Sequence, residues 1–398
     1  MTSTELLQEF KNTTFPPGFG FDAFTQDELD HFLNDPSQWG FALKKERGRG
    51  ILYGKRHTNL RCQLVNDRPK EERLKILGDK LRFFKIPEKL HVMVNNSLHF
   101  TISDIVDIGM GNSVYRVTLQ LSNGEEMAVV VKQEEWDAQS FFSRLSRELG
   151  WPYYRSSHIK DNYGGWQVLD YLGNTTIYDA VTRPEERTDI RLIEAQLAQH
   201  AALGDVLGRG DRHFENYLVR HGIVYPIDVS FLFWDGSEEW VWKYIAGGMS
   251  EYTLLSLAKS DEEFNERREA FWEVYFNTLK QLATQEQLIC RNIEECFGEK
   301  DPGTAIKTAF VHERLSNYEA FYEAQKQLYD DGHHEMCRRK EMKLKLRELA
   351  VSSPHILEEN PLLKMYYLAD LDRFSTFFLL EDRAEGDLLI CNQLRNKN

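Results

Sequence analysis

Short runs of β-branched and other apolar residues fill the region between positions 97 and 132. The runs are Ser97–Val106, Val114–Leu121 and Met127–Lys132, and Asn123-Gly124 lies between the second and the third. Runs of this length predict strands, and Asn-Gly between two of them is a strong hairpin signal. We therefore predict a three-stranded antiparallel meander.

A helical period replaces this pattern further along the chain. Asp137–Leu149 has apolar side chains at helical spacing and ends at Gly150-Trp-Pro, which stops a helix. A strand is predicted at Trp166–Asp170. Asp189–Leu207 has an apolar face and predicts a long helix that ends just before Gly208-Arg-Gly-Asp.

The carboxyl-terminal part of the chain has an almost entirely helical pattern. Long periodic stretches lie at Asp261–Cys296, Glu313–Leu349 and Pro361–Leu380, and Thr25–Leu33 predicts a short capped helix near the amino terminus. This order of elements predicts an α+β fold with a small β-rich lobe and a large helical lobe. The assigned ranges are 1–90 for an amino-terminal extension with a basic segment, 91–172 for the small lobe, and 173–398 for the large lobe with a helical extension.

The composition is that of a soluble globular protein, with 41% hydrophobic and 28% charged residues in a chain of 398. No apolar run reaches the roughly 18 residues of a membrane span, and the first residues lack the pattern of a secretory signal. The five cysteines are scattered without C-x-x-C spacing. This favours the cytoplasm or another reducing compartment and argues against zinc, with delivery into a host cell as a bacterial effector left open.

Charge is distributed unevenly along the chain. The formal charge is −14, yet Lys44–Lys85 holds 14 Lys or Arg against 5 Asp or Glu, so this segment carries +9 and the remainder −23. Such a segment is either solvated surface or a site for a polyanion, such as a phosphoinositide headgroup or an activating inositol polyphosphate. Nucleic acid fits less well, because no nucleic-acid-reading module accompanies the segment.

The segment Gly210-Asp-Arg-His-Phe-Glu-Asn216 has the residue types that phosphoryl transfer requires. Asp211 followed five residues later by Asn216 has the interval of a kinase catalytic loop. In such a loop the Asp addresses the substrate hydroxyl and the Asn reaches a metal ion. We therefore take Asp211 as the candidate catalytic carboxylate.

A predicted hairpin follows this segment. Tyr217–Val219 and Ile223–Ile227 are strand-like and are separated by a turn at His221-Gly222. Because the two strands are of nearly equal length, the hairpin returns Asp228 to the end where Asn216 lies. Asp228 is therefore the natural magnesium ligand.

Two upstream features would hold the phosphates of a nucleotide. The run Met127–Lys132 predicts a buried strand that ends in one cation, as Val-Ala-Ile-Lys does in kinases, so Lys132 would pair with the α and β phosphates. The turn between the first two strands has glycines that let backbone amides approach phosphate. The candidate nucleotide-binding residues of this turn are Gly109, Gly111, Asn112 and Ser113.

Gly210–Asn216 with Pro226-Ile-Asp228 resembles the Gly-Asp-Arg-His-x-x-Asn and Ile-Asp motifs of phosphatidylinositol 3- and 4-kinases. Actin-fragmin-kinase-like and HipA-like kinases share this branch of the protein-kinase superfamily. The resemblance covers residues 200–233 and extends more loosely back to about residue 100. In this chain Val229-Ser230 stands where Phe-Gly is expected, and the glycine turn contains fewer glycines.

The resemblance implies a bilobal protein-kinase-like fold and an ATP-dependent phosphotransferase that uses Mg²⁺, or alternatively Mn²⁺. The implied catalytic residues are Asp211, Lys132, Asn216 and Asp228, of which Asn216 and Asp228 bind the metal. The adenine would lie against Leu169–Leu172, with Asp170 and Leu172 as contacts through backbone atoms.

Several assignments stay open on the sequence alone. The acidic partner of Lys132 could be Glu134, Glu135, Asp137 or Glu148, with Asp137 or Glu148 favoured. His213 is more typical of a structural role than of a catalytic base. Arg212 either contacts phosphate or braces the loop of Asp211.

The acceptor of the phosphoryl group is also open. The segment 230–240 after Asp228 is apolar and acidic, which suits an anionic lipid headgroup poorly and favours protein Ser/Thr. A phosphoinositide acceptor, transfer of AMP from a reversed nucleotide, and a pseudokinase scaffold without turnover are the alternatives.

Overall fold

The computed structural model divides the chain into two compact units, one of Met1–Arg61 with Gly332–Asn398 and one of Cys62–Asp331. In the first unit it describes residue 333 and the backbone of two antiparallel strands, β1 (Phe41–Glu46) and β2 (Arg49–Gly54). In the second unit the described residues are 66, 68–94, 98–108, 114–134, 137–161, 164–177, 180, 189–210, 212, 216–229, 232–233, 252, 254–258, 260–298 and 302–331, with backbone alone at 161, 256 and 257. The helices predicted at Thr25–Leu33 and Pro361–Leu380 lie outside these residues.

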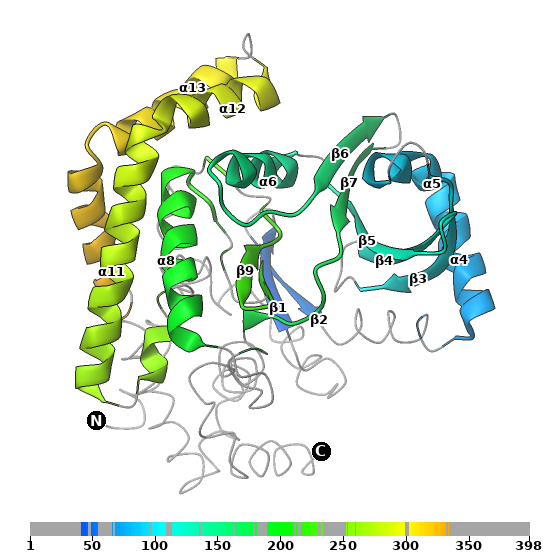
Figure 1. Cartoon of the computed structure of the whole chain (residues 1–398), viewed down its shortest axis with the longest axis horizontal. Coiled ribbons are helices and arrows are strands. Elements are labelled where there is room, and N and C mark those ends of the chain that lie inside the picture. The colour runs from blue at the N-terminus through cyan, green and yellow to red at the C-terminus, as the bar shows by residue number, and fades with distance from the viewer. Residues whose placement is uncertain are drawn as a thin grey trace, which may run out of the picture. The chain divides into compact units, whose positions relative to one another are not determined.

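A five-stranded antiparallel sheet dominates the first half of the second unit (Figure 1). Its strand order is β3-β4-β5-β7-β6. The strands are β3 (Phe100–Asp107), β4 (Val114–Leu121), β5 (Glu126–Gln133), β6 (Ser156–Asp161) and β7 (Gly164–Asp170). The predicted meander is confirmed, and β4 has the predicted bounds. The edge strand β6 was not predicted.

Alternation of burial along β4 shows why these residues form a sheet. Tyr115, Val117 and Leu119 are buried on one face, while the residues between them are half-exposed. The helix α4 (Lys70–Phe83) packs against β3 and buries Leu81 in the same core. A fully buried apolar side chain contributes about 1.5–3 kcal/mol, so this packing outweighs the polar character of the rest of α4. Sequence analysis treated this stretch only as part of a basic segment.

Two predicted helices flank the sheet and the following hairpin. The helix α6 (Ala138–Glu148) connects β5 to β6 and packs against β6. The helix α8 (Ile190–Val206) begins after Asp189, whose side chain accepts hydrogen bonds from the backbone N–H groups of Arg191 and Leu192. Both helices match their predicted bounds to within one residue.

The second half of the unit is helical, and its first helix α11 runs beside α8 (Figure 1). The labelled helices are α11 (Asp261–Thr284), α12 (Glu286–Phe297) and α13 (Pro302–Leu315), followed by a helical stretch at 318–331. The helical pattern predicted over Asp261–Cys296 is confirmed, and the stretch is divided into two helices, because α11 ends where Gln285 N–H bonds to Leu282 O. The helical pattern predicted over Glu313–Leu349 is confirmed as far as residue 331, with a turn at 316–317, and beyond it only residue 333 is described.

Shorter elements complete the described part of the unit. They are α5 (Ile86–Lys89), η3 (Leu90–Met93), η5 (Leu254–Leu257) and the hairpin β8 (Tyr217–Arg220) and β9 (Ile223–Pro226). The fold is therefore mixed α+β, with an antiparallel sheet followed by a helical region. Among the described helices, none has the length and apolar character that a membrane crossing requires.

Candidate functional site

The hairpin of β8 and β9 brings Asn216 and Asp228 to the same end. Its two-residue turn is His221-Gly222, whose φ angles of 54° and 75° are those of a tight primed hairpin turn. Tyr217 pairs with Pro226, and Ile227 N–H donates to Asn216 O at 2.8 Å. Asn216, which precedes β8, and Asp228, which follows Ile227, therefore lie near each other, as the nearly equal strand lengths predicted.

The backbone of Asp228 is fixed in an uncommon conformation. Its φ of 55° lies in the left-handed region, which residues other than glycine seldom adopt and which is found at functional sites. The next residue is held by α6, because Val229 N–H donates to the buried Gln139 Oε1 at 2.9 Å. The carboxylate itself remains accessible, with 46% of the side chain exposed.

Lys132 lies between two carboxylates. Its Nζ is 2.7 Å from Asp228 Oδ1 and 2.6 Å from Glu134 Oε2. Burial by itself would lower the pKa of Lys132, but the two negative charges outweigh it and raise the pKa above its ordinary value. The lysine is therefore a fixed cation at the end of β5, joined to a residue 96 positions away in sequence.

Glu134, the first residue after β5, is the partner of Lys132 that is near it in the sequence. Its backbone N–H donates to Gly165 O at 2.9 Å, and its carbonyl accepts a hydrogen bond from His158 Nε2 at 2.8 Å. Both Lys132 and Glu134 side chains are largely buried, at 11% and 9% exposure. Sequence analysis included Glu134 among the candidates but favoured other residues.

The favoured partners of Lys132 lie elsewhere. Glu148 Oε2 accepts a hydrogen bond from Asn292 Nδ2 at 2.8 Å and is 3.4 Å from Arg291 Nη2. The bond from Asn292 holds the pKa of Glu148 below its ordinary value. Asp137 is the residue immediately before α6. The preference for Asp137 or Glu148 was therefore wrong, because in the described part of the chain the carboxylates paired with Lys132 Nζ are those of Glu134 and Asp228.

Arg212 is buried and has a structural role. Its side chain is fully buried, and Nη2 is 2.6 Å from Asp205 Oδ1. The other oxygen of Asp205 accepts hydrogen bonds from Tyr275 at 2.6 Å and from Tyr329 at 2.9 Å. Arg212 thus ties the segment around Asp211 to α8 and to the later helices, which decides between the two roles that the sequence left open.

Arg209 is a second buried arginine that sequence analysis did not single out. It donates to Tyr217 OH at 3.0 Å and to Ile227 O at 3.2 Å, and its guanidinium lies 4.9 Å from the Tyr217 ring centroid. It therefore holds both strands of the hairpin next to Asp228. The only signal in the sequence was its place between two glycines, Gly208 and Gly210.

The end of β7 contains Asp170, one of the predicted nucleotide contacts. Its carboxylate accepts hydrogen bonds from the Arg155 backbone at 2.8 Å and from Arg155 Nη2 at 2.7 Å. Tyr171 N–H donates to Ala128 O at 3.3 Å, and Leu172 is half-exposed just beyond. The side chain of Asp170 and its backbone N–H, which donates to Arg155 O at 3.0 Å, thus fasten the end of β7 to the residue before β6.

The remaining predicted site residues lie outside the described part of the chain. They are Asp211, His213, Gly109, Gly111, Asn112 and Ser113. The last four residues lie in the sequence between Ile108 and Val114. Ile108 N–H donates to Val114 O at 3.0 Å, so the two ends of this segment are close together. In the pairing of β4 with β5, Val114 lies opposite Lys132. The turn therefore joins the sheet next to this lysine.

Metal-binding residue types do not gather into a larger cluster. Within the described residues there is no group of three or more His, Cys, Asp or Glu that could hold a metal ion. Asn216 and Asp228 are a smaller pair, made of one amide and one carboxylate.

The basic segment is partly neutralised where the structure describes it. Its arginines form three ion pairs, Arg68 with Glu72, Arg73 with Asp104 and Arg82 with Asp79. Arg73 also donates to Ile105 O at 2.8 Å and so fastens α4 to β3. Arg73 therefore serves the fold, whereas the pairs of Arg68 and Arg82 are exposed and contribute little. A polyanion ligand of this segment stays a prediction.

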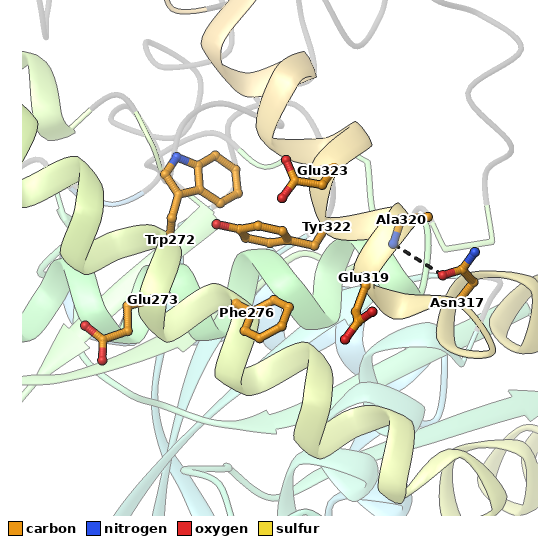
Figure 2. A pocket seen from close by; sticks show the side chains of 8 residues that line it. All are labelled: Trp272, Glu273, Phe276, Asn317, Glu319, Ala320, Tyr322 and Glu323. Atoms are coloured by element: carbon orange, nitrogen blue, oxygen red, sulfur yellow. Dashed lines mark hydrogen bonds between the residues drawn. The ribbon is translucent and has the colours of Figure 1, made fainter.

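A cavity of about 660 Å³ lies apart from these residues, between α11 and the helical stretch at 318–331 (Figure 2). The Tyr322 ring lies 5.7 Å from that of Trp272 and 5.0 Å from that of Phe276, measured between centroids. Lys132 and Asp228 take no part in its lining. The cavity therefore contributes nothing to the arrangement around the hairpin.

Comparisons with known proteins add no relative to these observations. No protein-family model matches the chain, and the search of curated proteins gives no match.

Proposed function

We propose that the chain is an ATP- and magnesium-dependent phosphotransferase of the kinase-like type, with the sheet as a small lobe and the helices as a large lobe. The observation that carries this proposal is the 2.7 Å contact between Lys132 Nζ and Asp228 Oδ1. A cation for the α and β phosphates and a carboxylate for the metal have to lie near each other, because both act on one triphosphate. Nothing in the intervening sequence requires the two residues to meet.

The order of the parts along the chain supports the same function. The glycine-containing segment between β3 and β4 leads into Val114, which pairs with Lys132, and backbone amides of this segment would cover the phosphates. The chain then passes through β7, where the backbone of Asp170 and Leu172 would contact adenine. Asn216 and Asp228 come last, which is the order of these parts in the kinases that the chain resembles.

The residues at the hairpin end fit a magnesium ion. Mg²⁺ prefers oxygen ligands and is usually held by one or two carboxylates together with substrate phosphates and water. Asp228 offers an accessible carboxylate and Asn216 an amide oxygen, so a larger protein cluster is not required. When bound, the metal would neutralise charge on the β and γ phosphates.

The proposed reaction is an in-line transfer of the γ-phosphoryl group. The acceptor hydroxyl oxygen forms a bond to the γ-phosphorus while the bond from that phosphorus to the β–γ bridging oxygen breaks, and ADP leaves with the electron pair. Asp211 receives the proton of the hydroxyl and passes it to solvent. Lys132 fixes the α and β phosphates so that the leaving oxygen stays in line.

A Ser or Thr hydroxyl of a protein is the acceptor that we propose. The reason is the apolar and acidic sequence at 230–240, which would repel an anionic lipid headgroup.

The test is transfer of label from ATP by the purified chain in the presence of Mg²⁺ and a cell extract. We expect γ-label in the protein fraction, no transfer of α-label, and loss of transfer in Asp211→Asn and Asp228→Asn. Label in the lipid fraction would replace the protein acceptor by a phosphoinositide. Transfer of α-label would mean AMP transfer, and no transfer of either label would refute the proposed activity and favour a pseudokinase scaffold.

A further inference from the structure

The two carboxylates on Lys132 are not equivalent. Glu134 is buried with the lysine, at 9% exposure, whereas 46% of the Asp228 side chain is exposed. A buried ion pair is costly to separate, because the charge left behind has lost its water. An exposed carboxylate can turn toward solvent or a ligand at much lower cost. The pair with Glu134 is thus the lasting one.

The backbone around each carboxylate supports this difference. Glu134 follows β5 directly and is held through its own N–H by Gly165 and through its carbonyl by His158. It lies two residues after Lys132, and residues at this spacing share one face of a strand. The main chain of Asp228 is fixed by its neighbours, and its carboxylate contacts Lys132 Nζ at 2.7 Å.

Metal binding and the contact with Lys132 compete for the same carboxylate. A divalent cation on Asp228 and Asn216 would draw the carboxylate away from the ammonium, since two cations repel each other at this distance. Lys132 would then keep one buried partner, Glu134, and would remain a charged, oriented group. Without Glu134 the lysine would depend on Asp228 alone.

We propose, on the basis of the proposed function, that Asp228 exchanges between Lys132 and the divalent cation while Glu134 holds Lys132 in place. Glu134 is then a positioning residue, and it takes the part that a carboxylate on the following helix was expected to play. The contact between Lys132 and Asp228 regulates the site by opposing metal binding.

The test is titration of the full chain with Mn²⁺ in the absence of nucleotide, followed by electron paramagnetic resonance of the free ion. Removing the competitor in Lys132→Met should tighten Mn²⁺ binding about tenfold, and the double variant Lys132→Met/Glu134→Gln should also bind more tightly than the unaltered chain. Glu134→Gln alone should weaken binding by a similar factor, because Asp228 becomes the only partner of the lysine.

Glu148→Gln is the matched control, since it removes a carboxylate that contacts Asn292 instead of Lys132. It should leave Mn²⁺ affinity unchanged. Unchanged or weaker binding in Lys132→Met would overturn the exchange, even if Glu134→Gln failed to fold. A lower Tm for Glu134→Gln with unaltered Mn²⁺ affinity would reduce Glu134 to a structural residue.

The two proposals fail in different ways. If Mn²⁺ affinity responds as expected but no phosphoryl group is transferred, the exchange stands and the phosphotransferase is wrong. If transfer occurs and Lys132→Met leaves Mn²⁺ affinity unchanged, the proposed exchange is wrong and the proposed phosphotransferase activity stands. If Asp228→Asn binds Mn²⁺ as the unaltered chain does, the exchange and the assigned metal site both fail.

Discussion

Gly204 in α8 lies against the guanidinium of Arg212. A Cβ atom added to Gly204 would lie 2.8 Å from Arg212 Nη1, closer than such contacts occur. The arginine side chain is fully buried and fixed by Asp205 Oδ1 and Ala201 O. Gly204→Ala should therefore push Arg212 away from Asp205.

Two opposing effects set the size of this change. Alanine is favoured over glycine in a helix by about 1 kcal/mol. Weakening a charged hydrogen bond costs about 1.5–3 kcal/mol, and full separation of a buried ion pair costs about 3–5 kcal/mol. The steric effect wins, so we expect Gly204→Ala to lower the free energy of unfolding by about 1–3 kcal/mol.

Gly78 in α4 is a matched control. A Cβ atom there meets nothing closer than 3.7 Å, so Gly78→Ala should raise the free energy of unfolding by up to about 1 kcal/mol. Urea unfolding of both variants, followed by tryptophan fluorescence, measures the two signs. If Gly204→Ala proves as stable as the unaltered chain, the buried contact of Arg212 with Asp205 is not the brace that we describe.

Two further predictions concern the buried polar groups around α8. Burial lowers the pKa of His200 to about 4, whereas a histidine of the unfolded chain has a pKa near 6.5. The contribution of the neutral imidazole to the free energy of unfolding is therefore complete above about pH 6.5 and decreases as the pH falls toward 4. The stability advantage over His200→Gln should therefore shrink between pH 7 and pH 4 in urea unfolding, and a constant difference would refute a neutral buried imidazole. Tyr275→Phe removes a hydroxyl 2.6 Å from Asp205 Oδ2 and should cost about 1.5–3 kcal/mol. Tyr329 donates to the same oxygen, so a double-mutant cycle should give non-additive losses, and simple addition would contradict a shared acceptor.

Local sequence patterns were enough to predict most elements near the site. The period of two along β4 and the turn residues between β8 and β9 determine those strands, because each depends on residues a few positions apart. The proximity of Asn216 and Asp228 follows from the same local rule. The edge strand β6 escaped prediction because its half-exposed polar sequence, Ser156–Asp161, lacks a strong apolar pattern.

Long-range contacts were beyond the sequence alone. The preference for Glu148 as the partner of Lys132 failed because Glu148 is bound by Asn292 of α12, a contact between residues 144 positions apart that no local pattern encodes. The roles of the buried arginines likewise depend on Asp205 and Tyr217, which lie on other elements. The end of α11 at Gln285 was missed because Thr284-Gln-Glu286 contains neither Gly nor Pro as a stop signal.

The most direct test of the central claim is a double-mutant cycle on the rate of γ-phosphoryl transfer with Lys132→Met and Asp228→Asn. If both residues act on one nucleotide, each single variant should slow transfer by at least about 100-fold. The double variant should then be little slower than the slower single variant, because groups that act as a unit are not additive. Single variants that transfer at the unaltered rate, or losses that multiply in the double variant, would contradict the account.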